Sequence, residues 1–138
     1  MNLLIIGDPH AHPDYDNDRF TALGKFIVKK QPDIIVCLGD MADMPSLSSY
    51  DKGTKGFEGR RYKKDVSAVI DAQEKLFAPL KEYNKGKARL HQKRYKTKCY
   101  MTLGNHEDRV SRATNSNPEL DGAISIDDFQ YKKFGWKC

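Results

Sequence analysis

The segment Asn2-Leu3-Leu4-Ile5-Ile6-Gly7 decides the fold, because it is a short apolar run that a glycine ends. It is too brief for a helix and is typical of a strand that is buried on both faces, so we expect a central strand here. A helix is predicted over 16–31, where apolar residues recur every three or four positions after Asp-Asn-Asp, a sequence that can cap a helix. Residues 33–38 repeat the opening pattern. Strand, helix and strand in this order predict a parallel pair with a right-handed crossover, and therefore an α/β fold.

A long loop and a second helix follow. Residues 41–61 are rich in Ser, Asp, Gly and Lys and lack a sustained period, so we expect a functional loop. An apolar stripe predicts a second crossover helix over 62–83, which Pro79 bends or ends.

The remaining third of the chain begins with a basic segment, 81–98, which leads into a predicted third strand over 99–104. Beyond it we expect helical turns near 107–113 and again near 125–131. Ser125 and Asp128 have the spacing of a capping box at the start of the second group of turns. The last residues, 134–138, read like a strand cut short.

Length and composition limit the class of protein. The 138 residues, 38% hydrophobic and 31% charged, predict a single domain over 1–138. The longest apolar run, 3–6, is far shorter than the ~20 residues of a spanning helix, and no secretion signal is visible, so no membrane partner is expected. Three cysteines without CxxC spacing fit neither a disulfide framework nor a thiolate zinc site. We therefore expect a cytoplasmic protein.

Positive charge is concentrated in two segments, 52–64 and 81–98, although the formal net charge is only +5. In both segments basic residues stand close to tyrosines, a combination that suits a phosphate backbone with a stacked base. The residues expected to contact phosphate or nucleic acid there are Arg60, Arg61, Lys93 and Arg94. The alternative is that both segments are solvated surface.

Metal-competent side chains follow each predicted strand: Asp8 and His10 the first, Asp40 the second, Asn105 and His106 the third. Because the carboxyl ends of parallel strands face one crevice, we expect these side chains to converge there. Carboxylate, amide and imidazole ligands suit Mn, Fe, Zn or Mg. A central Asp40 could bridge two cations, an arrangement that lowers the pKa of a bound water and clamps a phosphoryl group.

The blocks Gly7-Asp8-Pro9-His10, Gly39-Asp40 and Gly104-Asn105-His106-Glu107 carry a resemblance. In this order and spacing they are similar to the first three signature blocks of the calcineurin-like metallophosphoesterases, and residues 39–50 and 59–62 look like a phage-encoded branch, which implies the host cytoplasm. The resemblance implies a metallophosphoesterase-like sheet with crossover helices, a phosphoester substrate and two divalent metal ions, with manganese favoured. It assigns the metal ligands to Asp8, His10, Asp40 and Asn105, and protonation of the leaving group to His106.

The chain departs from the family after His106, where no further histidine occurs. In the family, a lone histidine and a Gly-His-x-His pair complete both metal sites. His12 and His91 lie out of order, so we expect them to be surface residues. The resemblance thus covers half of the family's β-sandwich domain. Three explanations stay open: a fragment of a longer enzyme, one piece of a split enzyme whose second chain supplies the missing histidines, or a half that has lost catalysis. The first two are favoured.

Four further residues near the motifs are expected to support the site. Asp43 could order the metal cluster or cap a turn. Glu107 could orient the neighbouring histidine, although an acid is favoured at a helix start in any case. Arg109 and Arg112 could reach a phosphate from one helix face, and surface placement is equally plausible.

Together these observations predict a metal-dependent phosphoesterase that hydrolyses phosphomonoesters or phosphodiesters, with nucleic acid or a nucleotide favoured as the substrate. The alternative from another class is a catalytically silent module, built on half of a phosphoesterase fold, that binds nucleic acid or a partner protein. Metal content and turnover distinguish the two.

Overall fold

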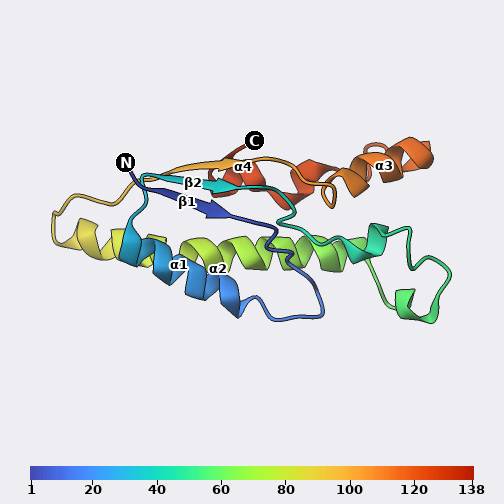
Figure 1. The fold of residues 1–138 in the computed structure, drawn as a ribbon, viewed down its shortest axis with the longest axis horizontal. Coiled ribbons are helices and arrows are strands. Elements are labelled where there is room, and N and C mark those ends of the chain that lie inside the picture. The colour runs from blue at the N-terminus through green and yellow to red at the C-terminus, as the bar shows by residue number, and fades with distance from the viewer.

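The computed structural model describes residues 1–138, and its framework is a parallel sheet (Figure 1). The strands lie in the order β1 (Leu3–Ile6), β2 (Ile34–Cys37), β3 (Lys98–Met101) and β4 (Trp136–Lys137). All three pairings are parallel, and the register aligns the last residues of β1, β2 and β3, namely Ile6, Cys37 and Met101. The predicted α/β class is confirmed, and the three loops that leave these strands start at the same edge.

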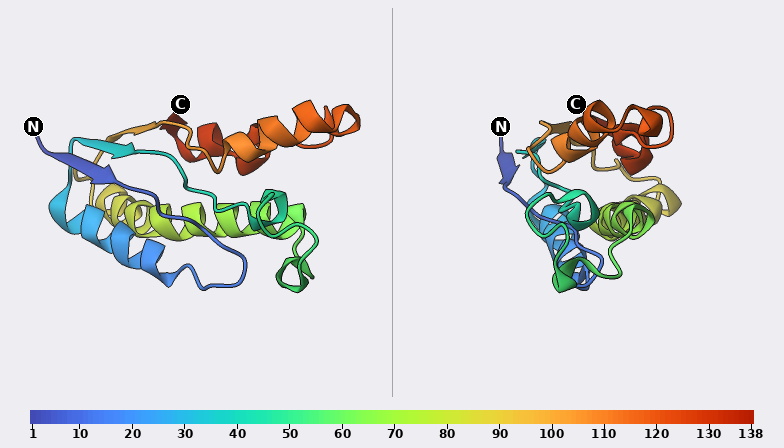
Figure 2. Two further views of the ribbon diagram at one scale, coloured as in Figure 1. Left: turned by 45° about the vertical axis from the view of Figure 1, so that its right-hand side comes forward. Right: turned by 90° about the vertical axis from the view of Figure 1, so that its right-hand side faces the viewer.

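Two long helices, α1 (Asp18–Lys30) and α2 (Tyr62–Arg89), connect the first three strands and lie together on one face of the sheet (Figures 1 and 2). Their apolar stripes meet the inward side chains of the strands. The most deeply buried side chains of this layer are Phe20, Ile27, Ile35, Val69 and Leu76.

Helix α2 continues for 28 residues and does not end at Pro79, although the sequence predicted a bend or an end there. Helix α1 approaches it closely at this point. A Cβ on Gly24 would collide with the backbone carbonyl of Leu76 and lie 2.9 Å from the ring of Pro79. Burial of the apolar stripe between the two helices and the sheet offsets the hydrogen bond that the proline cannot donate.

Strand β1 lies at the edge of the sheet, so the expectation of a central strand was wrong. The side chains of Leu3 and Ile5 are 54% and 57% exposed, because no helix covers the face opposite α1 and α2 at this edge. Tyr100 on β3 belongs to the same open face and is 37% exposed. An apolar run without alternation predicts burial on both faces, whereas this sheet is covered on one.

The segments that belong neither to the sheet nor to α1 and α2 are short or irregular. The loop 41–61 contains two 3-10 turns, η1 (Pro45–Leu47) and η2 (Lys55–Phe57). After β3 come α3 (Asp108–Ser116), η3 (Pro118–Leu120), η4 (Ile126–Phe129) and α4 (Tyr131–Phe134). The predicted capping box of Ser125 and Asp128 is present at η4. All three cysteines are free, and no helix has the length and apolar character needed to cross a membrane.

Candidate metal centre

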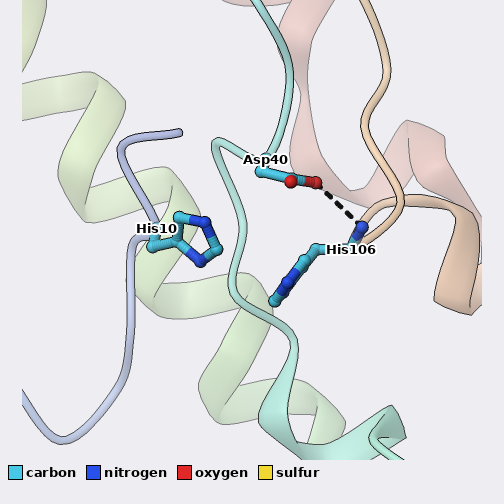
Figure 3. A group of neighbouring side chains, drawn as sticks. All are labelled: His10, Asp40 and His106. Carbon is cyan, nitrogen blue, oxygen red and sulfur yellow. Dashed lines mark hydrogen bonds between the residues drawn. The ribbon is translucent and has the colours of Figure 1, made fainter. Parts of the chain in front are cut away.

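Side chains from the first three strand ends converge as the motif order predicts (Figure 3). One donor atom each of His10, Asp40 and His106 lies within 4.8 Å of the others. His10 follows β1, Asp40 follows β2 and His106 follows β3, so residues almost a hundred positions apart form one group. Two imidazoles and a carboxylate in this arrangement can bind a divalent transition metal.

The loops after β1 and β2 are aligned beyond the sheet by backbone hydrogen bonds. The amide of His10 donates to the carbonyl of Asp40 at 2.9 Å, and the amide of Ala11 donates to the carbonyl of Met41 at 2.7 Å. The amide of Asp43 returns to the carbonyl of Ala11 at 3.1 Å. These bonds hold the first two motif loops side by side, as a continuation of the parallel pairing.

The backbone at the site is strained. Asp8, His10 and Asp40 have φ values of 26°, 48° and 50°, in the left-handed region that residues with a Cβ rarely adopt. Met44, further along the second loop, has a φ of 56°. Such residues cost of order 1–3 kcal/mol each and persist where the surroundings fix them. The strained backbone is therefore consistent with loops whose conformation places the side chains of His10 and Asp40 in the donor group.

Glycine is required where the second and third loops meet. A Cβ on Gly39 would lie 2.6 Å from the backbone nitrogen of Gly104, and a Cβ on Gly104 would collide with the carboxylate of Asp40. Because both residues lack a side chain, the amide of His106 reaches Oδ1 of Asp40 and donates to it at 2.8 Å. Asp40 is consequently buried yet hydrogen-bonded.

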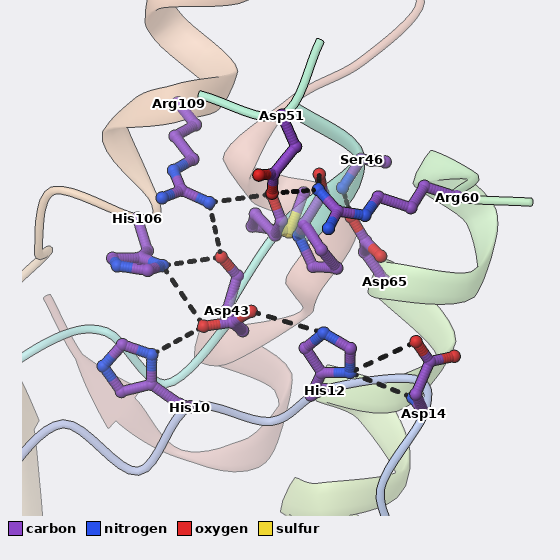
Figure 4. A network of polar contacts seen from close by, with 12 residues as sticks. His10, His12, Asp14, Asp43, Ser46, Asp51, Arg60, Asp65, His106 and Arg109 are labelled. Carbon is purple, nitrogen blue, oxygen red and sulfur yellow. Dashed lines mark hydrogen bonds and ion pairs between the residues drawn. The ribbon is translucent and has the colours of Figure 1, made fainter. Parts of the chain in front are cut away.

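Asp43 is the centre of a second polar group (Figure 4). Its Oδ1 lies 2.7 Å from Nδ1 of His10, and its backbone carbonyl lies 2.6 Å from Nδ1 of His106. Its Oδ2 lies 3.6 Å from Nε2 of His12. The expectation that Asp43 could order the cluster agrees with this geometry. His12 is mostly buried beside it, so its placement on the surface was wrong, while His91 is exposed.

The tautomers of these histidines follow from their partners. A carboxylate and a carbonyl oxygen can only accept, so Nδ1 of His10 and Nδ1 of His106 carry the hydrogens. In the neutral form of each of these two rings, Nε2 then carries a lone pair that no hydrogen bond uses. In His12 the assignment is reversed, because its Nδ1 accepts the backbone N–H of Asp14 at 3.0 Å. Histidines whose Nδ1–H donates to an oxygen, as in His10 and His106, are typical of metal sites.

Glu107 is completely buried and ties the second and third loops together. Its Oε2 accepts from the amides of Asp40 and Gly104 at 2.8 and 2.9 Å, and its Oε1 accepts from the amide of Ala42 at 3.1 Å. The hydroxyl of Tyr131 donates to Oε1 at 2.9 Å. Glu107 thus positions the loops through their backbone, and no hydrogen bond joins its side chain to the histidine that the sequence suggested.

Tyr131 is a residue that the sequence analysis did not identify. Burial, together with the negative charge of Glu107, raises the pKa of its phenol far above the ordinary value, so the hydroxyl keeps its hydrogen and acts as a donor. It lies in the C-terminal part of the chain, and nothing in its neighbouring residues indicates a link to the metal motifs.

Asp8 lies outside the group of three converging donors, and both Asp8 and Asn105 are exposed. Each stands within two residues of a histidine that belongs to the group. Their role as metal ligands stays a prediction.

The arginines near the site bind loop carbonyls in this structure. Arg60 donates to the carbonyl of Pro45 and pairs with Asp51 at 2.9 Å, and Arg109 donates to the carbonyl of Asp43 at 3.1 Å. They hold the loop 41–61 against the site. Arg112 donates to the carbonyl of Asn105 at 2.9 Å and pairs with Asp108, and Arg61 is exposed. A cavity of about 290 Å³ beside Asn105 is lined by Arg109 and Arg112, which are predicted phosphate contacts.

Lys93 and Arg94 lie at the other end of the molecule. They follow the C-terminal end of α2, near the amino ends of the strands, whereas the metal group lies at the carboxyl ends (Figure 1). The two basic segments of the sequence overlap the two ends of α2, and from Lys64 to Lys81 the helix rises about 26 Å at ~1.5 Å per residue.

Comparison with known proteins adds independent findings. A family model described as calcineurin-like phosphoesterase matches residues 1–136. The chain is 29% identical over 129 residues to the Gene 54 protein of Mycobacterium phage L5, which covers 93% of this chain and 45% of that protein. It is 30% identical over 107 residues to the Gene 54 protein of Mycobacterium phage D29, covering 78% and 36%. The chain thus spans less than half the length of these relatives. No solved structure matches.

Proposed function

Because the chain belongs to the calcineurin-like phosphoesterase family, we propose that it forms the part of a metal-dependent phosphoester hydrolase that holds the metal through His10 and Asp40 and donates a proton through His106. The observation that carries this proposal is the approach of donor atoms from all three residues to within 4.8 Å at the strand ends. The family accounts for the class of reaction, and the geometry supports these residues as its centre.

The donor set fits a divalent ion. Imidazole and carboxylate suit Mn, Fe and Zn, and we favour manganese. Asp8 and Asn105 are exposed and adjoin the group, so we propose that they would add ligands for two ions to those of His10 and Asp40. Ions held there would supply positive charge toward a phosphoryl oxygen and activate water.

The residues of the chain prepare the site for this chemistry. Asp43 accepts from Nδ1 of His10 and so directs Nε2 of that ring toward the metal position. The carbonyl of Asp43 accepts from Nδ1 of His106 in the same way, which leaves Nε2 of that ring free to take up a proton from solvent and then release it. We propose that this proton goes to the oxygen of the departing alcohol.

We further propose that the remaining metal ligands come from outside residues 1–138. Two ions need more donors than this group supplies, and among the four histidines of the chain His91 is exposed just beyond the C-terminal end of α2, away from this group. Either a further segment or a second chain can supply them. The open face of the sheet at Leu3, Ile5 and Tyr100 offers an apolar surface for that part.

Calorimetric titration with Mn²⁺ tests the metal assignment. His10→Ala and Asp40→Asn should each weaken binding by more than ~10-fold, since each removes a ligand or its charge. Asp14→Asn is the matched control, because this carboxylate is exposed and lies next to His12 without joining the group. Titrations of both ligand variants that equal the unmodified chain would refute the site.

The role of His106 needs a kinetic test with the completing segment supplied. His106→Ala should lower the turnover of an alkyl phosphodiester by about 10²–10⁴-fold, because the departing alkoxide needs a proton. p-Nitrophenolate leaves without protonation, so the turnover of a p-nitrophenyl ester should fall much less. Equal losses for both esters, together with a large loss of Mn²⁺ affinity, would show that His106 is a metal ligand and not the acid.

A further inference from the structure

The C-terminal end of α2 carries a concentration of positive charge that the candidate metal centre does not use. Residues 81–98 contain eight lysines and arginines and one acid, Glu82. None of the eight forms an ion pair, since the ion pairs of lysine and arginine in the structure involve only Arg60, Lys75 and Arg112. This end of the molecule is therefore an uncompensated cationic surface.

Part of this surface is hollowed. A pocket of about 410 Å³ is lined by the cationic side chains of Lys81, Lys85 and Arg94, with Phe77 and Phe134 beside them. No acidic residue lines it. We call it the basic pocket. A cavity of this size that is lined by cations and by the partly exposed ring of Phe134 can accept a phosphate together with an apolar group.

Neutral hydrogen bonds hold the backbone next to Arg94, the third of these cations. The side chain of Asn84 donates to the carbonyl of Tyr95 and accepts from its amide, both at 2.8 Å, and the hydroxyl of Tyr95 donates to the carbonyl of Pro32 at 2.6 Å. These bonds fold the chain after α2 back against the helix. The backbone at Arg94, which precedes Tyr95, is thereby placed beside α2, and the exposed side chain of Arg94 lines the basic pocket.

The helix dipole explains only some of these charges. Cations in the last turn, here Lys87 and Arg89, are favoured by the carbonyls at the helix end. Lys81 and Lys85 lie one to two turns earlier, where this effect has decayed, and like charges four residues apart destabilise a helix slightly. Three cations held together without a counter-ion indicate a surface that receives an anion.

We propose that the basic pocket binds the phosphate backbone of a single-stranded nucleic acid. The partly exposed aromatic ring of Phe134 beside the cations favours a strand with unpaired bases over a protein or a lipid surface. The proposal goes beyond the proposed function and does not depend on the metal.

Fluorescence anisotropy of a labelled oligothymidylate, measured in EDTA over a series of salt concentrations, tests this. Affinity should fall steeply with salt, with a log–log slope of about -0.7 for each phosphate neutralised. Lys85→Glu with Arg94→Glu should weaken binding by more than ~10-fold and flatten the slope by about 1.4, which corresponds to two lost contacts. The milder pair Lys85→Gln with Arg94→Gln should give an intermediate loss and keeps the packing.

The matched control is Lys25→Glu with Lys29→Glu, which changes the net charge equally on the exposed face of α1. It should shift affinity much less. Equal losses for the two Glu pairs would overturn the proposal, because binding would then follow net charge alone. Displacement of the oligonucleotide by polyglutamate or by phosphatidylserine vesicles as effectively as by unlabelled strand would also overturn it. Asp40→Asn should leave this binding unchanged, so a failure here and a failure of the metal centre are distinguishable.

Discussion

The hydroxyl of Tyr131 donates a hydrogen bond to Oε1 of Glu107 at 2.9 Å, and both side chains are buried. Glu107 also accepts the amides of Asp40, Ala42 and Gly104. The C-terminal part of the chain is thereby joined to the loops that carry the metal motifs. Disturbing this carboxylate should affect folding and metal binding together.

Two substitutions separate these effects. Tyr131→Phe removes one donor and should lower the free energy of unfolding by about 1–2 kcal/mol with little change in Mn²⁺ affinity. Glu107→Gln places an amide N–H₂ against backbone donors, so it should destabilise more and also weaken Mn²⁺ binding, because Asp40 and Gly104 lose their acceptor. Urea unfolding and calorimetric titration measure the two effects. A Gln variant that equals the unmodified chain in both would contradict this role.

Gly104→Ala should damage the site through its backbone. The added Cβ would collide with the carboxylate of Asp40, and overpacking of this kind costs about 1–3 kcal/mol. Gly7→Ala is the matched control, because Gly7 also precedes a metal motif residue and a Cβ there meets nothing within 4 Å. Thermal or urea unfolding of both variants checks the difference. Equal stability would mean that the close approach of the two loops is not required.

Asp65→Asn should change how stability depends on pH. Burial raises the pKa of Asp65 above its ordinary value of 3.8, although the amide of Ser46 donates to its carboxylate at 2.9 Å. The folded state therefore favours the protonated form. The unmodified chain should lose stability as the pH rises from about 3.8 through the raised folded pKa, whereas the Asn variant has no charge to bury there.

Urea unfolding over this pH range measures the effect. The Asn variant should equal the unmodified chain in acid and exceed its stability at neutral pH. If the substitution instead lowers the stability at neutral pH and leaves it unchanged in acid, the charged form of Asp65 is favoured by folding and the prediction is wrong.

Asp43→Asn should weaken Mn²⁺ binding although Asp43 is not a proposed ligand. Its carboxylate orients His10 and faces His12, and loss of such a partner typically costs about 10–100-fold in metal affinity. The fold should persist, because the amide keeps an oxygen that accepts from His10. Titration with Mn²⁺ checks this against Asp14→Asn. Unchanged affinity in the Asp43→Asn variant would mean that the histidines are held by packing alone.

Features of the fold that depend on residues close together in the chain could be predicted from the sequence alone. The apolar runs ending in glycine marked three strands, the spacing of apolar residues marked α1 and α2, and Ser125 with Asp128 marked a capping box. The order of Asp8, His10, Asp40, Asn105 and His106 after those strands identified the edge where donors meet. These features depend on hydrophobic period, on capping and on the common direction of parallel strands, which are all local properties or simple consequences of topology.

Only the tertiary structure decided which residues occupy the site and which leave it. His12 entered beside Asp43, and Tyr131 reached Glu107, because folding joins segments whose sequences carry no mutual signal. Strand β1 became an edge because the position of a strand in a sheet depends on its partners and on what covers each face, neither of which its own residues determine.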